Sequence, residues 1–117
     1  MHDDDPEDRY PLYPLGMLRR HGLIGAQDLA QRLPGWSEHQ LREAFWPAYR
    51  SIRRSEAELE RCVGPDGGER VLRLNGQALF VSEDCWNFQV LAGAELMDAL
   101  VQALQRRRAA PAGQPAP

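Results

Sequence analysis

The sequence predicts an α+β fold that is mostly helical, with one β-hairpin and a long C-terminal helix. Two short segments with apolar residues at helical spacing lie on either side of Pro34-Gly35. Asn75-Gly76 separates two stretches in which apolar residues alternate, as they do in a hairpin. Residues 85–106 then carry an apolar stripe at the spacing of a long amphipathic helix.

The length and the distribution of charge favour one small domain. At 117 residues the chain can build one modest core. We expect that core over residues 10–106, between a disordered acidic leader at 1–9 and a disordered tail at 107–117. Residues 1–8 hold five acidic and no basic side chains, whereas residues 9–82 hold eleven arginines against eight acids. Despite a net charge of −3, the core is therefore mildly basic, so any DNA affinity should be moderate and sensitive to salt or require a dimer.

The cysteines and the hydropathy favour the cytoplasm. Cys62 and Cys85 form no CxxC pair and no signal peptide precedes them, so we expect reduced, buried thiols. A disulfide between them is the alternative. Residues 86–104 are interrupted by polar side chains and do not read as a membrane span. All fourteen basic residues are arginine, a coding bias that hints at a GC-rich bacterial genome.

The first predicted elements are short. Residues 15–21 read as a helix that carries Arg19 on its outer face and ends at Gly22 as its C-cap. The apolar pair Leu23-Ile24 then predicts one brief strand. A further helix is expected from residue 26. It must end at Leu33, because Pro34 disfavours helical backbone in the residue before it. Its apolar face comprises Ala26, Leu29, Ala30 and Leu33.

The next helix is predicted from Ser37 to Trp46. Ser37 and Gln40 have the spacing of a capping box, in which each side chain satisfies a backbone N–H of the first turn. Pro47 cannot donate a helical hydrogen bond, so we expect the helix to end near Trp46. Its buried stripe comprises Leu41, Ala44, Phe45 and Ala48.

Together, residues 26–46 are typical of a DNA-binding helix-turn-helix. The outer face of the second helix carries His39, Gln40 and Arg42, whose side chains suit hydrogen bonds to base edges in the major groove. Glu43 on the same face counts against this reading, since a carboxylate repels phosphates. The alternative is an ordinary helical hairpin whose second helix packs a core or meets a protein partner.

Residues 49–63 allow two readings. Apolar residues at near-heptad spacing favour a helix, restarted at a capping box from Ser55 to Glu58. The other reading is a strand over residues 59–63. Arg50 and Arg53 fall in this region and suit phosphate contacts, although nearby glutamates are equally consistent with a solvated face.

A hairpin is predicted over residues 70–82, with the turn at Asn75-Gly76. This pair tolerates the two positive φ angles of a type I′ turn. In that register Leu72 lies opposite Leu79 and Val71 opposite Phe80. One face then holds Leu72, Leu74, Leu79 and Val81, and the other holds Val71, Arg73, Ala78 and Phe80.

The last helix is expected over residues 85–106, with Ser82 or Asp84 as its cap. Its apolar surface is too wide for a small domain to cover alone, which favours a homodimer. Complete burial within the monomer is the alternative. The expected dimerisation stripe comprises Val90, Ala94, Met97, Val101 and Leu104.

The order of short helix, helix-turn-helix, hairpin and long terminal helix resembles the winged helix-turn-helix superfamily, especially small dimeric bacterial regulators. The resemblance covers residues 15–104 and consists of pattern without a signature motif. It implies that residues 37–46 read the major groove while the hairpin over 70–81 serves as a wing beside the DNA backbone. The low positive charge and the long insert over 49–68 depart from the family and weaken the implied DNA role more than the implied fold.

Taken together, these patterns predict a dimeric, double-stranded-DNA-binding transcriptional regulator. His39, Gln40 and Arg42 are the expected base contacts. Enzyme chemistry, a metal site and a cofactor are not expected, because both internal histidines are isolated and no catalytic or nucleotide-binding motif occurs. A non-enzymatic adaptor that binds another protein is the alternative. The expected phosphate contacts are Arg19, Arg50, Arg53 and Arg73.

Overall fold

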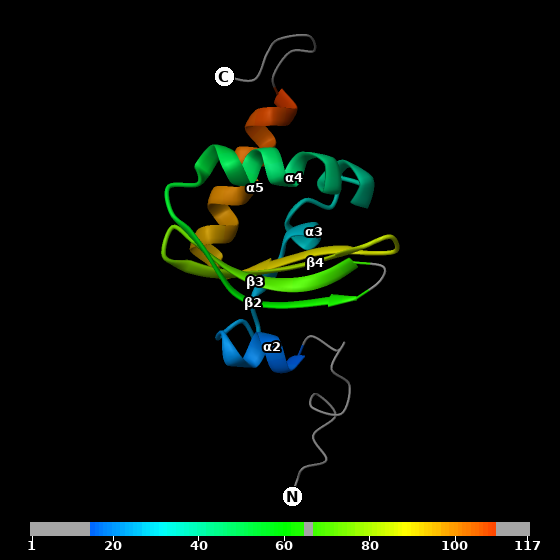
Figure 1. The fold of residues 1–117 in the computed structure, drawn as a ribbon. Helices are drawn as coiled ribbons and strands as arrows, with labels where there is room; N and C mark the ends of the chain where they lie inside the picture. Colours follow the sequence, from blue (N-terminus) through cyan, green and yellow to red (C-terminus); the bar gives the residue numbers. More distant parts are fainter. Residues whose placement is uncertain (1–14, 65–66, 110–117) are drawn as a thin grey trace, which may run out of the picture.

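The computed structural model describes residues 15–64 and 67–109. One antiparallel sheet of five strands lies between helices on both of its faces (Figure 1). The predicted leader at 1–9 and the tail from 110 lie outside the described residues. The elements in chain order are α2 (Leu15–Arg20), β1 (Gln27–Asp28), α3 (Leu29–Arg32), α4 (Glu38–Ile52), β2 (Glu56–Gly64), β3 (Gly67–Leu74), β4 (Gln77–Asp84), β5 (Phe88–Ala92) and α5 (Ala94–Ala109).

The strand order is β1-β5-β4-β3-β2. Strands β2 to β5 therefore follow one another across the sheet, each antiparallel to the last. The short β1 pairs only with the end of β5, through Gln27 opposite Ala92 and Asp28 opposite Leu91. Strand β2 forms the other edge, and its pairing with β3 shifts register between Glu58 and Glu60. Such a bulge protects an edge strand against further pairing.

The predicted fold class, mostly helical with a single hairpin, is wrong. The predicted hairpin exists as β3 and β4, but β2 and β5 flank it, so it forms the middle of a sheet rather than a projecting wing. Strand β5 lies within the segment predicted as the start of the last helix. Phe88, Val90 and Ala92 alternate along it and are all buried on one face, which is the strand pattern.

The hairpin itself is confirmed in detail. Asn75 and Gly76 have φ angles of 52° and 85°, as a type I′ turn requires. Leu72 pairs with Leu79, and Val71 with Phe80, in the predicted register. The two predicted faces also occur, because Leu72 packs in the cluster beneath α4 and α5 while Val71 packs in the cluster beside α2.

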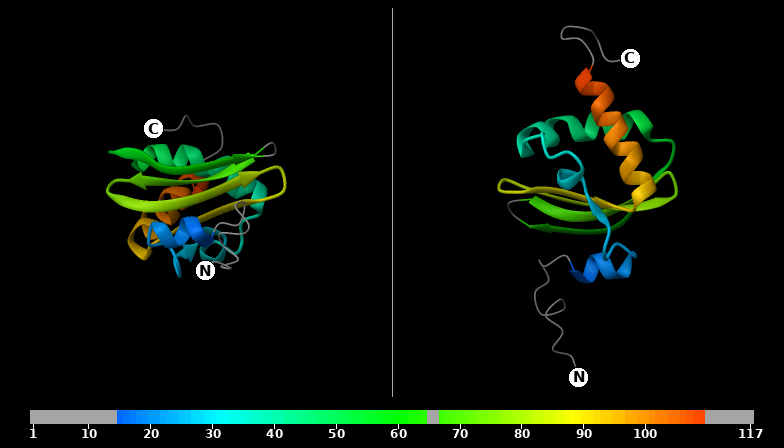
Figure 2. Two further views of the ribbon diagram at one scale, coloured as in Figure 1. Left: turned by 60° about the horizontal axis from the view of Figure 1, so that its bottom comes forward. Right: turned by 180° about the vertical axis from the view of Figure 1, so that it is seen from behind.

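The larger core lies between the sheet and the helices α4 and α5, which cross on one face of it (Figure 2, right). Within the predicted dimerisation stripe, Val90, Met97 and Leu104 are fully buried and Val101 nearly so, all against the chain's own sheet or helices. Only Ala94 is exposed. The stripe is therefore used inside the monomer and provides no dimer surface.

Helix α2 covers part of the opposite face (Figure 2). Its Met17 and Leu18 pack with Val71 and Phe80 of the sheet. Glu60 of β2 forms an ion pair with Arg20 and a hydrogen bond of 2.8 Å with the His21 ring, and so fixes α2 to the sheet. The predicted C-cap is confirmed, since Gly22 has a φ of 70° and its N–H donates to the Arg19 carbonyl.

The helix pair of the predicted helix-turn-helix is altered at both members. The first is reduced to the single turn α3, because the preceding residues pair with β5 as strand β1. The second, α4, has the predicted capping box but continues through Pro47 to Ile52. Burial of Phe45, Ala48 and Tyr49 on either side of Pro47 holds this helix against the core, which outweighs the missing hydrogen bond.

Three other segments complete or correct the predicted elements. In the region 49–63, α4 continues to Ile52 and strand β2 begins at Glu56, so the strand reading holds for residues 59–63. No strand forms at Leu23-Ile24, and Ile24 is exposed. At the C-terminus α5 extends to Ala109, past the predicted domain boundary at 106. Across residues 15–64 and 67–109, no helix is long and apolar enough to span a membrane.

Candidate protein-binding surface

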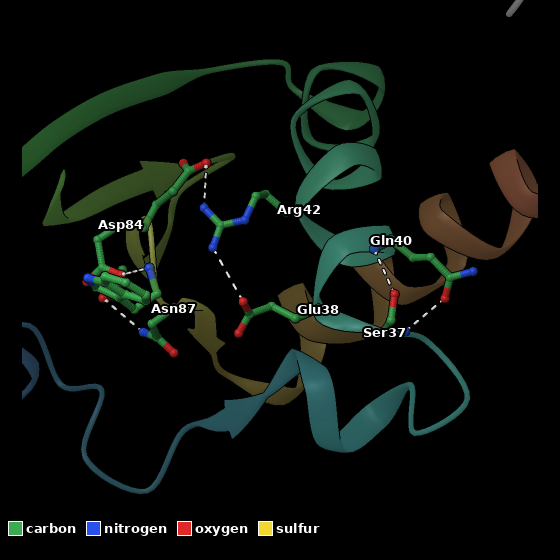
Figure 3. Close-up of polar contacts among 9 residues, drawn as sticks. Ser37, Glu38, Gln40, Arg42, Asp84 and Asn87 are labelled. Atoms are coloured by element: carbon green, nitrogen blue, oxygen red, sulfur yellow. Dashed lines mark hydrogen bonds and ion pairs between the residues drawn. The ribbon is translucent and has the colours of Figure 1, made fainter. Parts of the chain in front are cut away.

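Two of the expected base-contacting side chains, Gln40 and Arg42, are engaged within the chain (Figure 3). The side-chain amide oxygen of Gln40 accepts the backbone N–H of Ser37 at 2.8 Å. The backbone N–H of Gln40 donates to the Ser37 hydroxyl at 3.1 Å. Arg42 lies 3.5 Å from Glu38 and 3.8 Å from Glu83. His39 is exposed and lies 3.4 Å from Glu43. Two of the three expected readers thus stabilise α4 and its contact with the sheet.

The expected phosphate-contacting arginines do not gather on one face. Arg19 lies on α2, across the sheet from α4. Arg50 and Arg53 lie at the end of α4, and Arg53 pairs with Glu56 at 3.4 Å. Arg73 alternates with the buried Leu72 and Leu74 of β3, so it points to the α2 side of the sheet. No single DNA groove could contact all four side chains.

Exposed apolar side chains instead mark one end of the sheet. The structure exposes three large apolar side chains among the residues it describes: Ile24 at 55%, Val63 at 66% and Trp86 at 82%. Val63 lies near the end of β2, and Trp86 lies in the turn between β4 and β5. These two connections occur at the same end of the sheet, because Gly67 of β3 pairs both with Gly64 and with Asp84.

A groove of about 220 Å³ adjoins these residues on the α4 side of the sheet end. Two glycines line the groove, and neither position tolerates a side chain, because backbone of the neighbouring strands occupies the place of a Cβ atom. A Cβ at Gly68 would lie 2.6 Å from the Cys62 carbonyl oxygen, and one at Gly67 only 2.2 Å from that of Glu83. We call this region, with the adjacent Trp86, the sheet-end surface. It comprises Arg61, Val63, Gly67, Gly68, Glu69, Arg70, Glu83 and Trp86.

An aromatic and charged wall from α4 borders the sheet-end surface. The Arg70 guanidinium lies over the Trp46 ring, with Cζ 4.6 Å from the ring centroid. The Trp46 indole N–H donates to Glu83 at 3.2 Å, and the same carboxylate is the one that faces Arg42. Stacking on an indole restricts the rotamers of a long arginine side chain. Arg70 is therefore held in a defined position beside the groove.

Glu69 lies at the margin of the sheet-end surface and has a perturbed carboxyl. Partial burial raises its pKa, the nearby Asp84 charge raises it further, and the hydrogen bond from the Ser82 hydroxyl, at 3.5 Å, opposes the shift. When folding raises the pKa of a carboxyl, the folded protein is more stable with that carboxyl protonated than with it ionised. Its effect on stability therefore becomes unfavourable as pH rises from the ordinary glutamate pKa through the raised value.

We expect Glu69→Gln to stabilise the protein at neutral pH but not in acid. At about pH 3, below the ordinary glutamate pKa, the Glu69 carboxyl is neutral in both the folded and the unfolded chain, so the two unfolding free energies should agree, whereas at about pH 7 the variant should gain up to about 1 kcal/mol. Urea unfolding of the wild type and the variant at the two pH values measures this difference. A variant that is less stable at neutral pH would show that the charged carboxylate makes favourable contacts.

The sequence analysis did not predict the main residues of the sheet-end surface as part of a site. Trp86 fell inside the predicted last helix, and Arg61 and Val63 fell in a segment of undecided structure. The alternation of Phe88, Val90 and Ala92 was the available signal, because a strand there places Trp86 in a turn. Cys62 is partly buried and Cys85 exposed, so the expectation of two buried thiols is wrong for Cys85.

The fold and the surface define a small α+β protein with an antiparallel sheet and a mixed aromatic and charged end. Within the described ranges, no three His, Cys, Asp or Glu side chains are placed to hold a metal ion. Comparisons of the chain with models of protein families, with curated proteins and with solved structures found no match. In particular, nothing identifies it as a winged helix-turn-helix protein.

Proposed function

We propose that the chain is a non-enzymatic protein-binding module and that the sheet-end surface is its binding site. The observation that carries the proposal is the exposure of Trp86, at 82%, at the same end of the sheet as an open groove. A tryptophan offers more apolar area than almost any other side chain, and tryptophan and arginine are enriched among residues that dominate protein interfaces. Burying Trp86 and Val63 against a partner would remove most of their apolar area from water.

The composition of the sheet-end surface supports a protein partner. Trp86 and Val63 supply apolar area at the end of the sheet, while Arg61 and Arg70 supply charged groups one cross-strand pair further in. Interfaces between proteins combine an apolar centre with a polar rim in this way.

DNA binding stays an untested prediction, but the features on which it relied are used otherwise. Gln40 caps α4, Arg42 faces two carboxylates, and the hairpin expected as a wing is an interior part of the sheet. A recognition surface for DNA would also need basic side chains on one face. The protein-binding proposal leaves these internal contacts of Gln40 and Arg42 in place.

We expect Trp86→Ala to weaken partner binding by at least about 2 kcal/mol without loss of the fold. The side chain is mostly in solvent, so its truncation leaves the core unchanged. A photoreactive phenylalanine analogue at position 86, compared with the same analogue at position 24, would identify the partner by cross-linking in cells of the source organism. Titration calorimetry with the purified partner then compares wild type, Trp86→Ala and the matched exposed control Ile24→Ala.

Two results would overturn the proposal. One is a partner whose affinity is the same for the wild type and for Trp86→Ala. The other is saturable binding to fragmented genomic DNA that weakens steeply with salt and is lost in Arg42→Ala, since that outcome supports the regulator. Fluorescence anisotropy across a salt series provides this second measurement on the same protein preparations.

A further inference from the structure

We propose that the sheet-end surface binds an acidic segment of its partner, with one partner carboxylate seated between Arg61 and Arg70 and apolar side chains against Val63 and Trp86. This inference rests on the proposed function and adds the chemistry of the partner. It is carried by the arrangement of two arginines across neighbouring strands.

Arg61 of β2 and Arg70 of β3 are direct cross-strand partners. Residues opposite each other in an antiparallel pair project to the same face, with Cβ atoms about 5 Å apart, and like charges placed so are unfavourable. Val63 and Gly68 form the next such pair on that face, beside the groove. An anion between the two guanidinium groups would accept hydrogen bonds mainly from Arg70, because Arg61 already donates to Glu58.

Among the residues that the structure describes, Arg61 pairs with a carboxylate and Arg70 does not. The Arg61 guanidinium donates to Glu58 at 2.9 Å and 3.1 Å. Arg70 stacks on Trp46, and among the described residues no carboxylate lies within ion-pair distance of its guanidinium. Because stacking uses the flat face of the guanidinium, its edge keeps the N–H donors that fit a carboxylate in a paired, planar arrangement.

The neighbouring acids restrict the ligand to a single carboxylate. Glu83 faces Arg42 and accepts from Trp46, and Glu58 of the same face pairs with Arg61. These two groups balance the arginines of the groove, so a polyanion such as a nucleic-acid backbone would meet as much repulsion as attraction. One side-chain carboxylate flanked by apolar residues can reach Arg70 while its neighbours contact Val63 and Trp86.

The test uses three blocked peptides of one pattern, acetyl-ELELEL-amide, acetyl-QLQLQL-amide and acetyl-KLKLKL-amide, titrated into the full ¹⁵N-labelled chain. We expect saturable shifts of the Trp46 indole N–H and the Gly67 and Gly68 amides with the glutamate peptide. The glutamine peptide should bind more weakly and the lysine peptide should give no saturable shift. The Trp46 indole is a sensitive reporter because it bonds Glu83 and carries Arg70 on its ring.

Two matched variants locate the binding group. Arg70→Gln should weaken binding of the glutamate peptide at least about tenfold, and Arg70→Lys should weaken it less, since the charge remains but the planar donors are lost. Arg73→Gln, on the same strand but the opposite face, should leave the affinity unchanged.

Equal binding of all three peptides, an equal loss in Arg73→Gln, or the same shifts with inorganic phosphate alone would overturn the acidic-segment proposal. Its failure can be separated from failure of the proposed function. If Trp86→Ala releases the identified partner while Arg70→Gln does not, the binding surface is correct and the partner is not held through a carboxylate. If neither variant affects the partner, both proposals fail.

Discussion

Replacing Asn75 by alanine is expected to lower the free energy of unfolding by about 3 kcal/mol, through three lost hydrogen bonds and an unfavourable backbone conformation. The Asn75 side-chain oxygen accepts the backbone N–H groups of Arg54 at 2.7 Å and Ser55 at 3.0 Å. Its side-chain amide donates to the Ile52 carbonyl at 2.8 Å. The residue thus fixes the connection between α4 and β2 as well as the β3-β4 turn.

Two other substitutions separate the turn conformation from the hydrogen bonds. Asn75→Gly accepts the φ of 52° and loses only the side-chain contacts, so it should recover about 1 kcal/mol relative to alanine. Asn75→Asp keeps the acceptor for Arg54 and Ser55 and loses the donor to Ile52. Urea unfolding of the four proteins measures the series. If the alanine variant is as stable as the wild type, the contacts to residues 52–55 contribute nothing and the interpretation fails.

Asn75 illustrates which parts of the fold could be predicted from the sequence. Its turn depends on two adjacent residues and the alternation around them, and both are local. Its contacts to Ile52, Arg54 and Ser55 span twenty or more residues, so the sequence pattern gave no sign of them. The capping box of α4 was likewise predictable because Ser37 and Gln40 satisfy each other's backbone within one helical turn.

The incorrect predictions arose where tertiary packing decided the structure. Val90, Ala94, Met97, Val101 and Leu104 have helical spacing, and this period hid the strand that ends before Gly93. Pro47 was expected to end α4, but buried neighbours keep the helix continuous. The predicted first helix lost most of its length to pairing with β5, a partner more than sixty residues away.

The sheet-end surface could not be predicted for a related reason. The residues that shape it come from three strands, one turn and α4, and no single segment contains its pattern. Arg61 and Arg70 become neighbours only once the β2-β3 register is known. The exposure of Trp86 depends on the β4-β5 turn, which the predicted helix removed.

Replacing Phe45 by alanine is expected to destabilise the protein by about 3 to 5 kcal/mol, since it leaves a cavity in the larger core. Phe45 is fully buried. Its ring centroid lies 4.8 Å from that of Trp46, 5.6 Å from that of Phe88 and 5.9 Å from that of Tyr49. The substitution therefore removes contacts that join α4 to β5. Thermal or urea unfolding followed by far-ultraviolet circular dichroism measures the loss.

Phe45→Leu is the matched variant, because it retains most of the buried volume and loses the aromatic edge contacts. Its free energy of unfolding should lie between those of wild type and Phe45→Ala, and equal stability of the alanine variant and wild type would contradict the packing account.

The leucine variant also tests whether the core supports the sheet-end surface. Trp46 packs on Phe45 and supports Arg70. We therefore expect the leucine variant to hold Trp46 less firmly and to bind the glutamate peptide more weakly while the protein stays folded. Unchanged peptide affinity would mean that the bond from Trp46 to Glu83 is enough to hold the indole in place.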